Sequence, residues 1–167
     1  EATKHLLSKG RRRIVHVTVS STESVYRERF RGYVQALAEF GVPLDMNLVY
    51  LGDLSLESGA AAAKFVHALP QRPDGVFVAN DNCAAGCVIG LKAHGLRVPE
   101  DIAVVGFNDD PVSRIVDPNL TTIHYPGHEM GELAARSLIN HLNGAADIML
   151  TQTILLRSDL VVRESTG

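Results

Sequence analysis

The fold is decided by residues 73–111, PDGVFVANDNCAAGCVIGLKAHGLRVPEDIAVVGFNDDP. Two continuous apolar segments, 76–79 and 102–107, flank a stretch of helix-forming residues, and each ends in polar side chains. Strands buried on both faces lose the alternation of a half-exposed strand, so this pattern predicts a parallel β-α-β unit with a right-handed connection. Asn80 and Asn108 then follow parallel strands and lie at the carboxyl edge of the sheet, where open α/β folds bind their ligands.

The segments on either side continue the alternation of helix and strand. Before this unit the sequence predicts helices over 2–8, 23–40 and 56–69 and strands over 14–19 and 48–51. After it the sequence predicts a loop over 110–119, a strand over 120–124, a helix over 126–143 and β-rich segments over 149–156 and 160–162. The predicted fold class is therefore α/β, a doubly wound and mostly parallel sheet with helices on both faces.

Composition limits the class of protein. The 167 residues suit one domain, or one domain with part of a neighbour, and 46% hydrophobic residues are enough for a core. No apolar run approaches the ~18 residues of a membrane span, and no signal peptide opens the sequence. The first residues look like a helix already under way, which suggests a piece of a longer protein. The net charge of −3 argues against nucleic-acid binding by this piece alone.

The two cysteines are interpreted as reduced thiols. Cys83 and Cys87 lie four residues apart on one predicted helix, which is poor geometry for a disulfide. Reduced, core-like thiols are typical of a cytoplasmic protein, which is the predicted location.

Several motifs occur together along the whole chain. They are KHLLSKGRRRI at 4–14, YRERFRGY at 26–33, GDLSLESG at 52–59, GLRVPEDIAVVGFND at 95–109, DPNLTTIHYP at 117–126 and LVVREST at 160–166. In this order and spacing, they resemble the effector-binding domain of the LacI/GalR transcription regulators, which is related to periplasmic sugar-binding proteins.

The resemblance implies a periplasmic-binding-protein-like fold in two parts. Residues 1–122 and 149–167 would form the C-terminal subdomain, and 123–148 would be an excursion into an N-terminal subdomain that is largely absent. The implied function is sensing of a small-molecule effector and formation of a homodimer, with operator DNA bound only through an absent helix-turn-helix domain. A carbohydrate is the favoured effector and a nucleoside or nucleobase the alternative. The rival interpretation is an exported sugar-binding protein that serves a transporter.

Polar residues at the strand ends are the candidate ligand contacts. Ser20, Arg29, Asn80 and Asn108 would meet at one edge, and amide and guanidinium groups suit a ligand rich in hydroxyls. The resemblance places Arg29, Asn80 and Asn108 at effector-binding positions, and Asn108 stands where the family usually has an acid. It also implies a polar contact at Tyr125, and Leu54 replaces an aromatic residue that stacks on the ligand in many members.

Each candidate has a simpler structural interpretation. Arg29 could be a surface residue of its helix, and Asn80 or Asp81 could cap the helix that follows them. We expect Asp81 to lie nearer the cap and Asn80 nearer the ligand. Asp109 is expected to be structural, because acids that follow a strand often bind loop amides.

Enzymatic motifs are absent from the sequence. No G-x-S-x-G, P-loop or G-x-G-x-x-G pattern occurs, so neither an enzyme nor a cofactor is predicted. His124 and His128 are four apart, but Pro126 breaks the helix that would align them, and no third metal ligand is evident.

The helix over 81–94 is apolar nearly all the way round, whereas a helix on a sheet needs only one apolar stripe. The rest of its surface is therefore expected to meet either a second copy of the chain, as the resemblance implies, or other elements of the same chain. The candidate interface residues are Ala84, Cys87, Val88, Val112, Ile115 and Val116.

Overall fold

A computed structural model describes residues 1–20, 24–145 and 153–167. Its centre is a four-stranded sheet in the order β2-β1-β3-β4. All neighbouring strands are parallel, which confirms the predicted sheet, and Val17 lies beside both Tyr50 and Val78. The strands are β1 (Ile14–Thr18), β2 (Val49–Leu51), β3 (Gly75–Val78) and β4 (Ala103–Val105).

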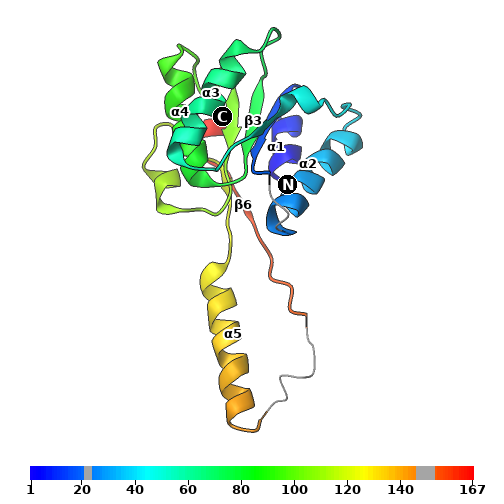
Figure 1. Ribbon diagram of the computed structural model, residues 1–167, viewed down its shortest axis with the longest axis vertical. Helices are drawn as coiled ribbons and strands as arrows, with labels where there is room; N and C mark the ends of the chain where they lie inside the picture. The colour runs from blue at the N-terminus through cyan, green and yellow to red at the C-terminus, as the bar shows by residue number, and fades with distance from the viewer. Residues whose placement is uncertain (21–23, 146–152) are drawn as a thin grey trace.

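Helices cover both faces of this sheet (Figure 1). Alternate residues of a strand point to opposite faces, so each strand contributes to two cores. Val15, Val76 and Val104 pack with the helices α3 and α4, whereas Ile14 and Phe77 pack with α1 and α2. The helices are α1 (Ala2–Ser8), α2 (Ser24–Glu39), α3 (Leu56–Ala68) and α4 (Asp81–Ala93).

The helices α3 and α4 approach each other closely because glycines line their contact. A Cβ atom added to Gly86 would lie 2.0 Å from the carbonyl oxygen of Leu56, and one added to Gly59 would lie 2.0 Å from the carbonyl oxygen of Cys83. The near absence of side chains at these positions lets the two helix backbones touch. The same close packing accounts for the small residues in both helices.

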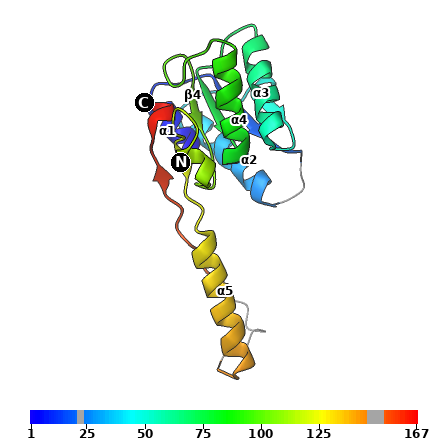
Figure 2. The same cartoon turned by 90° about the vertical axis from the view of Figure 1, so that its left-hand side faces the viewer.

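Beyond β4, the chain leaves the sheet and returns to it. Strand β5 (Thr122–Ile123) pairs antiparallel with β6 (Leu160–Val161), and α5 (Gly127–Leu142) lies between them in sequence. Figures 1 and 2 show α5 extending away from the body of the protein. None of its residues is buried.

Short 3-10 helices complete the fold, namely η1 (Met46–Leu48), η2 (Pro111–Arg114) and η3 (Glu164–Thr166). The last of these anchors the end of the chain, because the hydroxyl of Ser165 donates to the carbonyl oxygen of Val104 at 2.6 Å. No helix among the described residues is long and apolar enough to cross a membrane.

One predicted strand is wrong in part. Residues 153–156 have no regular secondary structure, and residues 149–152 of the same segment lie outside the described residues. Ile154 and Leu155 are exposed and pair with no neighbouring strand among the described residues. A β-rich sequence forms a strand only where another strand offers hydrogen-bond partners.

Candidate functional site

The candidate site lies where the parallel strands end. The amide of Ala79 donates to the carbonyl oxygen of Val17, so the chain leaves β1 and β3 at the same level. Ser20 follows β1, Asn80 follows β3 and Asn108 follows β4, as the sequence predicts. The structure therefore brings these three positions to one edge of the sheet.

Arg29 reaches this edge from α2. Its Nη1 donates to the carbonyl oxygen of Ala79 at 2.5 Å, and its guanidinium carbon lies 3.8 Å from the centroid of the Phe107 ring. The ring of Tyr26 lies 5.4 Å away. Partial burial lowers the pKa of Arg29, although an arginine stays charged at any physiological pH. The guanidinium is thus held by two aromatic rings and one carbonyl group within the part of the chain that the structure describes.

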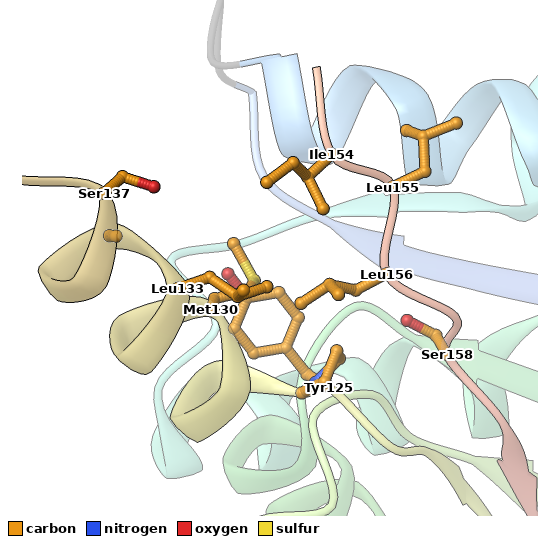
Figure 3. A pocket seen from close by; sticks show the side chains of 10 residues that line it. Tyr125, Met130, Leu133, Ser137, Ile154, Leu155, Leu156 and Ser158 are labelled. Atoms are coloured by element: carbon orange, nitrogen blue, oxygen red, sulfur yellow. The ribbon is translucent and has the colours of Figure 1, made fainter. Parts of the chain in front are cut away.

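Arg29 also lines a pocket of about 430 Å³ together with Phe107, Ile123 and Tyr125. Tyr125 is 43% exposed and lines a second pocket, of about 400 Å³, on the side of α5. Figure 3 shows the side chains of Met130 and Leu133 from α5 and of Leu156 from the returning chain around the Tyr125 ring. Tyr125 therefore stands between the sheet edge and α5.

Asn80 takes the capping role that was expected of Asp81. Asn80 is the N-cap of α4, because its Oδ1 accepts from the amide of Cys83 at 2.8 Å, and its Nδ2 donates to the carbonyl oxygen of Leu54 at 3.1 Å. Asp81 is fully buried and accepts from the amide of Asp110 at 2.8 Å and from the hydroxyl of Thr122 at 2.7 Å. Burial raises the pKa of Asp81. The expectation that Asp81 lies nearer the cap is wrong, because the residue just before the first helical turn has the geometry to cap it.

Asn108 and Asp109 adopt left-handed backbone conformations, with φ of 120° and 60°. The Nδ2 of Asn108 donates to the Asp110 carboxylate at 3.1 Å. The Asp109 carboxylate accepts from Nη2 of Arg163 at 2.5 Å and from Nη2 of Arg114 at 2.9 Å. Burial alone would raise the pKa of Asp109, but these guanidinium groups outweigh it and hold the pKa below its usual value.

Leu54 and Ser20 lie apart from the Arg29 pocket. Leu54 is 4% exposed and belongs to the core beneath α3 and α4, so its side chain offers almost no surface to a ligand. Ser20 is exposed and lines a separate hollow beside Tyr26 and Arg27. Phe107 and Tyr26, which hold Arg29, are the residues that the sequence prediction missed. Phe107 could have been found, because it lies two residues after the β4 strand and directly precedes Asn108.

Residues 3–166 match the family described as the periplasmic binding protein-like domain. The chain belongs to this family. The domain is 32% identical to the HTH-type transcriptional repressor CytR of Escherichia coli (strain K12) over 166 residues, which cover 99% of this chain and 48% of the repressor. It spans about half the length of the curated relatives it matches.

Solved structures give the same result. The domain superimposes on a transcriptional regulator CelR–cellobiose complex with a TM-score of 0.87 and 35% identity, over 98% of this chain and 50% of that one. A LacI-type transcription regulator from Bifidobacterium animalis subsp. lactis DSM 10140 gives a TM-score of 0.89 and 30% identity, over 99% and 62% of the two chains. The resemblance to LacI-type regulators and the periplasmic-binding-protein-like fold are confirmed.

The predicted interface of this periplasmic binding protein-like domain needs correction. Four of its six residues are buried within the chain, and the chain itself therefore covers most of the apolar α4 surface. These four are Ala84, Cys87, Val88 and Val116. They pack in the core that α3 and α4 share, which leaves them no surface for a second chain. Val112 is half-buried and Ile115 is 78% exposed, so for these two the interface remains a prediction.

The cysteines of the domain are free and buried, as predicted. Burial raises the pKa of the Cys83 thiol to about 12 and also raises that of Cys87. Both thiols are therefore protonated and unreactive at neutral pH. Among the described residues, no group of three or more His, Cys, Asp or Glu side chains is arranged to hold a metal ion.

Proposed function

We propose that this domain is the effector-sensing and dimerisation part of a cytoplasmic, DNA-binding transcriptional regulator. The observation that carries the proposal is the guanidinium of Arg29, which contacts the rings of Tyr26 and Phe107 at the sheet edge, in a chain whose relatives are named repressors and regulators. A charged fork and amide groups at one edge suit a small polar ligand rich in oxygen atoms. The names of the relatives favour a regulator over a transporter component and over an enzyme.

The ligand class is proposed from the same edge. CelR is in complex with cellobiose, and other relatives are named CytR and PurR, so sugars and nucleosides form the first panel to test. Leu54 is buried and supplies no aromatic platform, whereas Phe107 and Tyr125 supply rings on the other side of Arg29. Each good hydrogen bond to Arg29 would contribute about 1.5–3 kcal/mol.

We further propose that residues 123–148 pack against a second subdomain of the longer protein. The helix α5 carries Met130 and Leu138, which are 43% and 49% exposed, and Ile154 of the returning chain is 55% exposed. Exposed apolar residues on one helix and on the neighbouring returning segment indicate a surface that a partner would cover. The pocket between them, shown in Figure 3, is a place for such a partner's side chains.

Dimerisation is proposed through the exposed apolar residues near α4. Ile89 is 56% exposed, and Ile115 follows η2, which packs on α4. The ion pair between Lys92 and Asp117, with 2.5 Å between Nζ and Oδ2, borders this surface. Ile115→Glu should turn the dimer into a monomer in sedimentation equilibrium, whereas Met46→Glu, which changes another exposed apolar residue near β2, should not.

The proposed function is tested with the full-length regulator. A panel of sugars and nucleosides is screened for a rise in melting temperature, and any ligand found is added to a fluorescence anisotropy titration with DNA from upstream of the protein's own gene. We expect one ligand to raise the melting temperature and to change the DNA affinity. No binding of DNA under any condition would contradict the proposal.

A further inference from the structure

The carboxylate of Asp109 lies where two crossing segments meet the sheet. The outgoing segment, 121–125, leads from the sheet to α5, and the returning segment, 159–163, leads back. Asp109 Oδ2 lies 3.4 Å from His124 Nδ1 on the outgoing segment, and Asp109 Oδ1 lies 2.5 Å from Arg163 Nη2 on the returning one. Only 6% of the Asp109 side chain is exposed. One buried carboxylate therefore contacts both segments.

The backbone around Asp109 is bonded to the outgoing segment as well. The amide of Asn108 donates to the carbonyl oxygen of Ile123 at 2.9 Å, and the amide of Tyr125 donates to the carbonyl oxygen of Asn108 at 3.2 Å. The amide of Asp109 donates to the hydroxyl of Thr122 at 3.4 Å. A displacement of Asn108 and Asp109 is consequently passed to Thr122, Ile123 and Tyr125, which precede α5.

The loop holds two neighbouring residues in unfavourable conformations. Asn108 and Asp109 both have positive φ, which residues other than glycine seldom adopt. Strain of this kind persists only where surrounding contacts impose it, and here the ion pairs of Asp109 with Arg163 and Arg114 do so. Loss of those ion pairs would therefore remove the contacts that hold Asp109 in place.

We propose that Asp109 is a positioning residue that couples the ligand-binding edge to the two crossing segments, and so to the direction in which α5 leaves the body. The proposal rests on the proposed function, because Asn108 is the residue through which a ligand would act on the loop. Arg163 reinforces this link, since its Nη1 also donates to the carbonyl oxygen of Leu120 at 2.7 Å, just before the outgoing segment. In Figures 1 and 2, the two segments run side by side between the sheet and α5.

The first test needs no ligand. Hydrogen exchange by mass spectrometry is compared for the full-length protein and its Asp109→Asn variant, which keeps the side-chain shape and removes the charge. Exchange at Tyr125 and His124 should become about tenfold faster, while α3 should stay unchanged. Asp101→Asn is the matched control, because it removes an ion pair with the 70%-exposed Arg97 that precedes β4. Unchanged exchange in both crossing segments would overturn the proposal.

The second test measures whether a ligand bound at the sheet edge changes hydrogen exchange in the two crossing segments. Cytidine and cellobiose serve as probes, and the one that binds should slow exchange in both crossing segments of the wild-type protein. In Asp109→Asn the same probe should bind with a Kd within about threefold of wild type, yet slow the exchange of these segments much less. Full protection in the variant would show that Asp109 does not carry the coupling.

The variant could fail to fold, or neither probe could bind, and each outcome has its own measurement. If Asp109→Asn does not fold, Arg163→Lys takes its place, because it keeps the charge and loses the planar fork that meets Asp109. If neither probe binds the wild-type protein, sensing of sugars and nucleosides loses its support, and the exchange rates without probe decide the proposal about Asp109 alone.

Discussion

The guanidinium group of Arg29 lies face-on over the Phe107 ring, 3.8 Å from its centroid, and joins helix α2 to the end of strand β4. The same group donates to the carbonyl oxygen of Ala79 beyond β3. One side chain thus connects elements at the edge on which the candidate ligand residues lie, and it lines the same pocket as Tyr125.

Replacing Arg29 with Lys should destabilise the domain. A lysine keeps the charge but loses the planar contact with Phe107 and the geometry of the bond to Ala79, so we expect a loss of about 1–2 kcal/mol. The control is Arg27→Lys on the same helix, where the side chain is 63% exposed and a change below about 0.5 kcal/mol is expected. Urea unfolding measures both, and equal stability of the two variants would contradict the geometry.

Replacing Gly86 with Ala should separate α3 from α4. The added Cβ would lie 2.0 Å from the carbonyl oxygen of Leu56, which is backbone and cannot move aside without shifting the helix. Overpacking of this kind costs about 1–3 kcal/mol or more. Gly131→Ala in α5 is the matched control, because nothing lies within 4 Å of its added Cβ and helix propensity predicts a gain of about 0.5–1 kcal/mol. We expect Gly86→Ala to lower the melting temperature and Gly131→Ala to raise it.

His16 should make stability depend on pH. Its ring is stacked between Phe77 and Tyr33, its Nδ1 contacts the carbonyl oxygen of Phe77 at 3.1 Å, and burial lowers the pKa to about 4 from an ordinary 6.5. The unfolded chain therefore binds a proton first as pH falls. The stability contributed by neutral His16 is complete above pH 6.5 and is lost progressively down to about pH 4, by about 3 kcal/mol in total.

The contribution of His16 is isolated by comparing wild type with His16→Phe between pH 7 and pH 4. The carboxylates titrate in both proteins, so the difference in unfolding free energy reports His16. His67→Phe, at an exposed position, is the control for the substitution itself. If the unfolding free energy of His16→Phe falls with pH as steeply as that of the wild type, the pKa of His16 is not lowered in the folded protein.

The isolated 167-residue domain should bind sugars weakly or not at all in calorimetry. Arg29 and Tyr125 line one pocket at this edge and would contact a ligand from one side only, whereas the side chain of Asn80 caps α4. A second subdomain, which we propose for the longer protein, would supply the other side. Nanomolar affinity of the isolated domain, roughly −12 kcal/mol, would contradict the proposal that the ligand site is shared between two subdomains.

Roles at the ligand edge were only partly predictable. The position of Asn80, Asn108 and Ser20 at the ends of parallel strands followed from the apolar runs that precede them, because parallel strands share one carboxyl edge. The partner of each side chain did not follow, since Asn80 binds Leu54 and Asp81 binds Thr122, which are distant in sequence. The sequence shows that a polar group is present at a strand end. Its hydrogen-bond partner is known only from the tertiary structure.

By itself, the sequence determined the alternation of strands and helices, the parallel sheet and the edge at which polar residues gather. These properties depend on the period of apolar residues and on chain direction, which are local. The tertiary structure alone decided that Ala84, Cys87 and Val88 are buried in the core of their own chain, that residues 153–156 form no strand, and that Asp109 contacts the two crossing segments. Hydrophobicity requires that a surface be buried but is non-directional, so the identity of the covering partner depends on contacts between residues far apart in the chain.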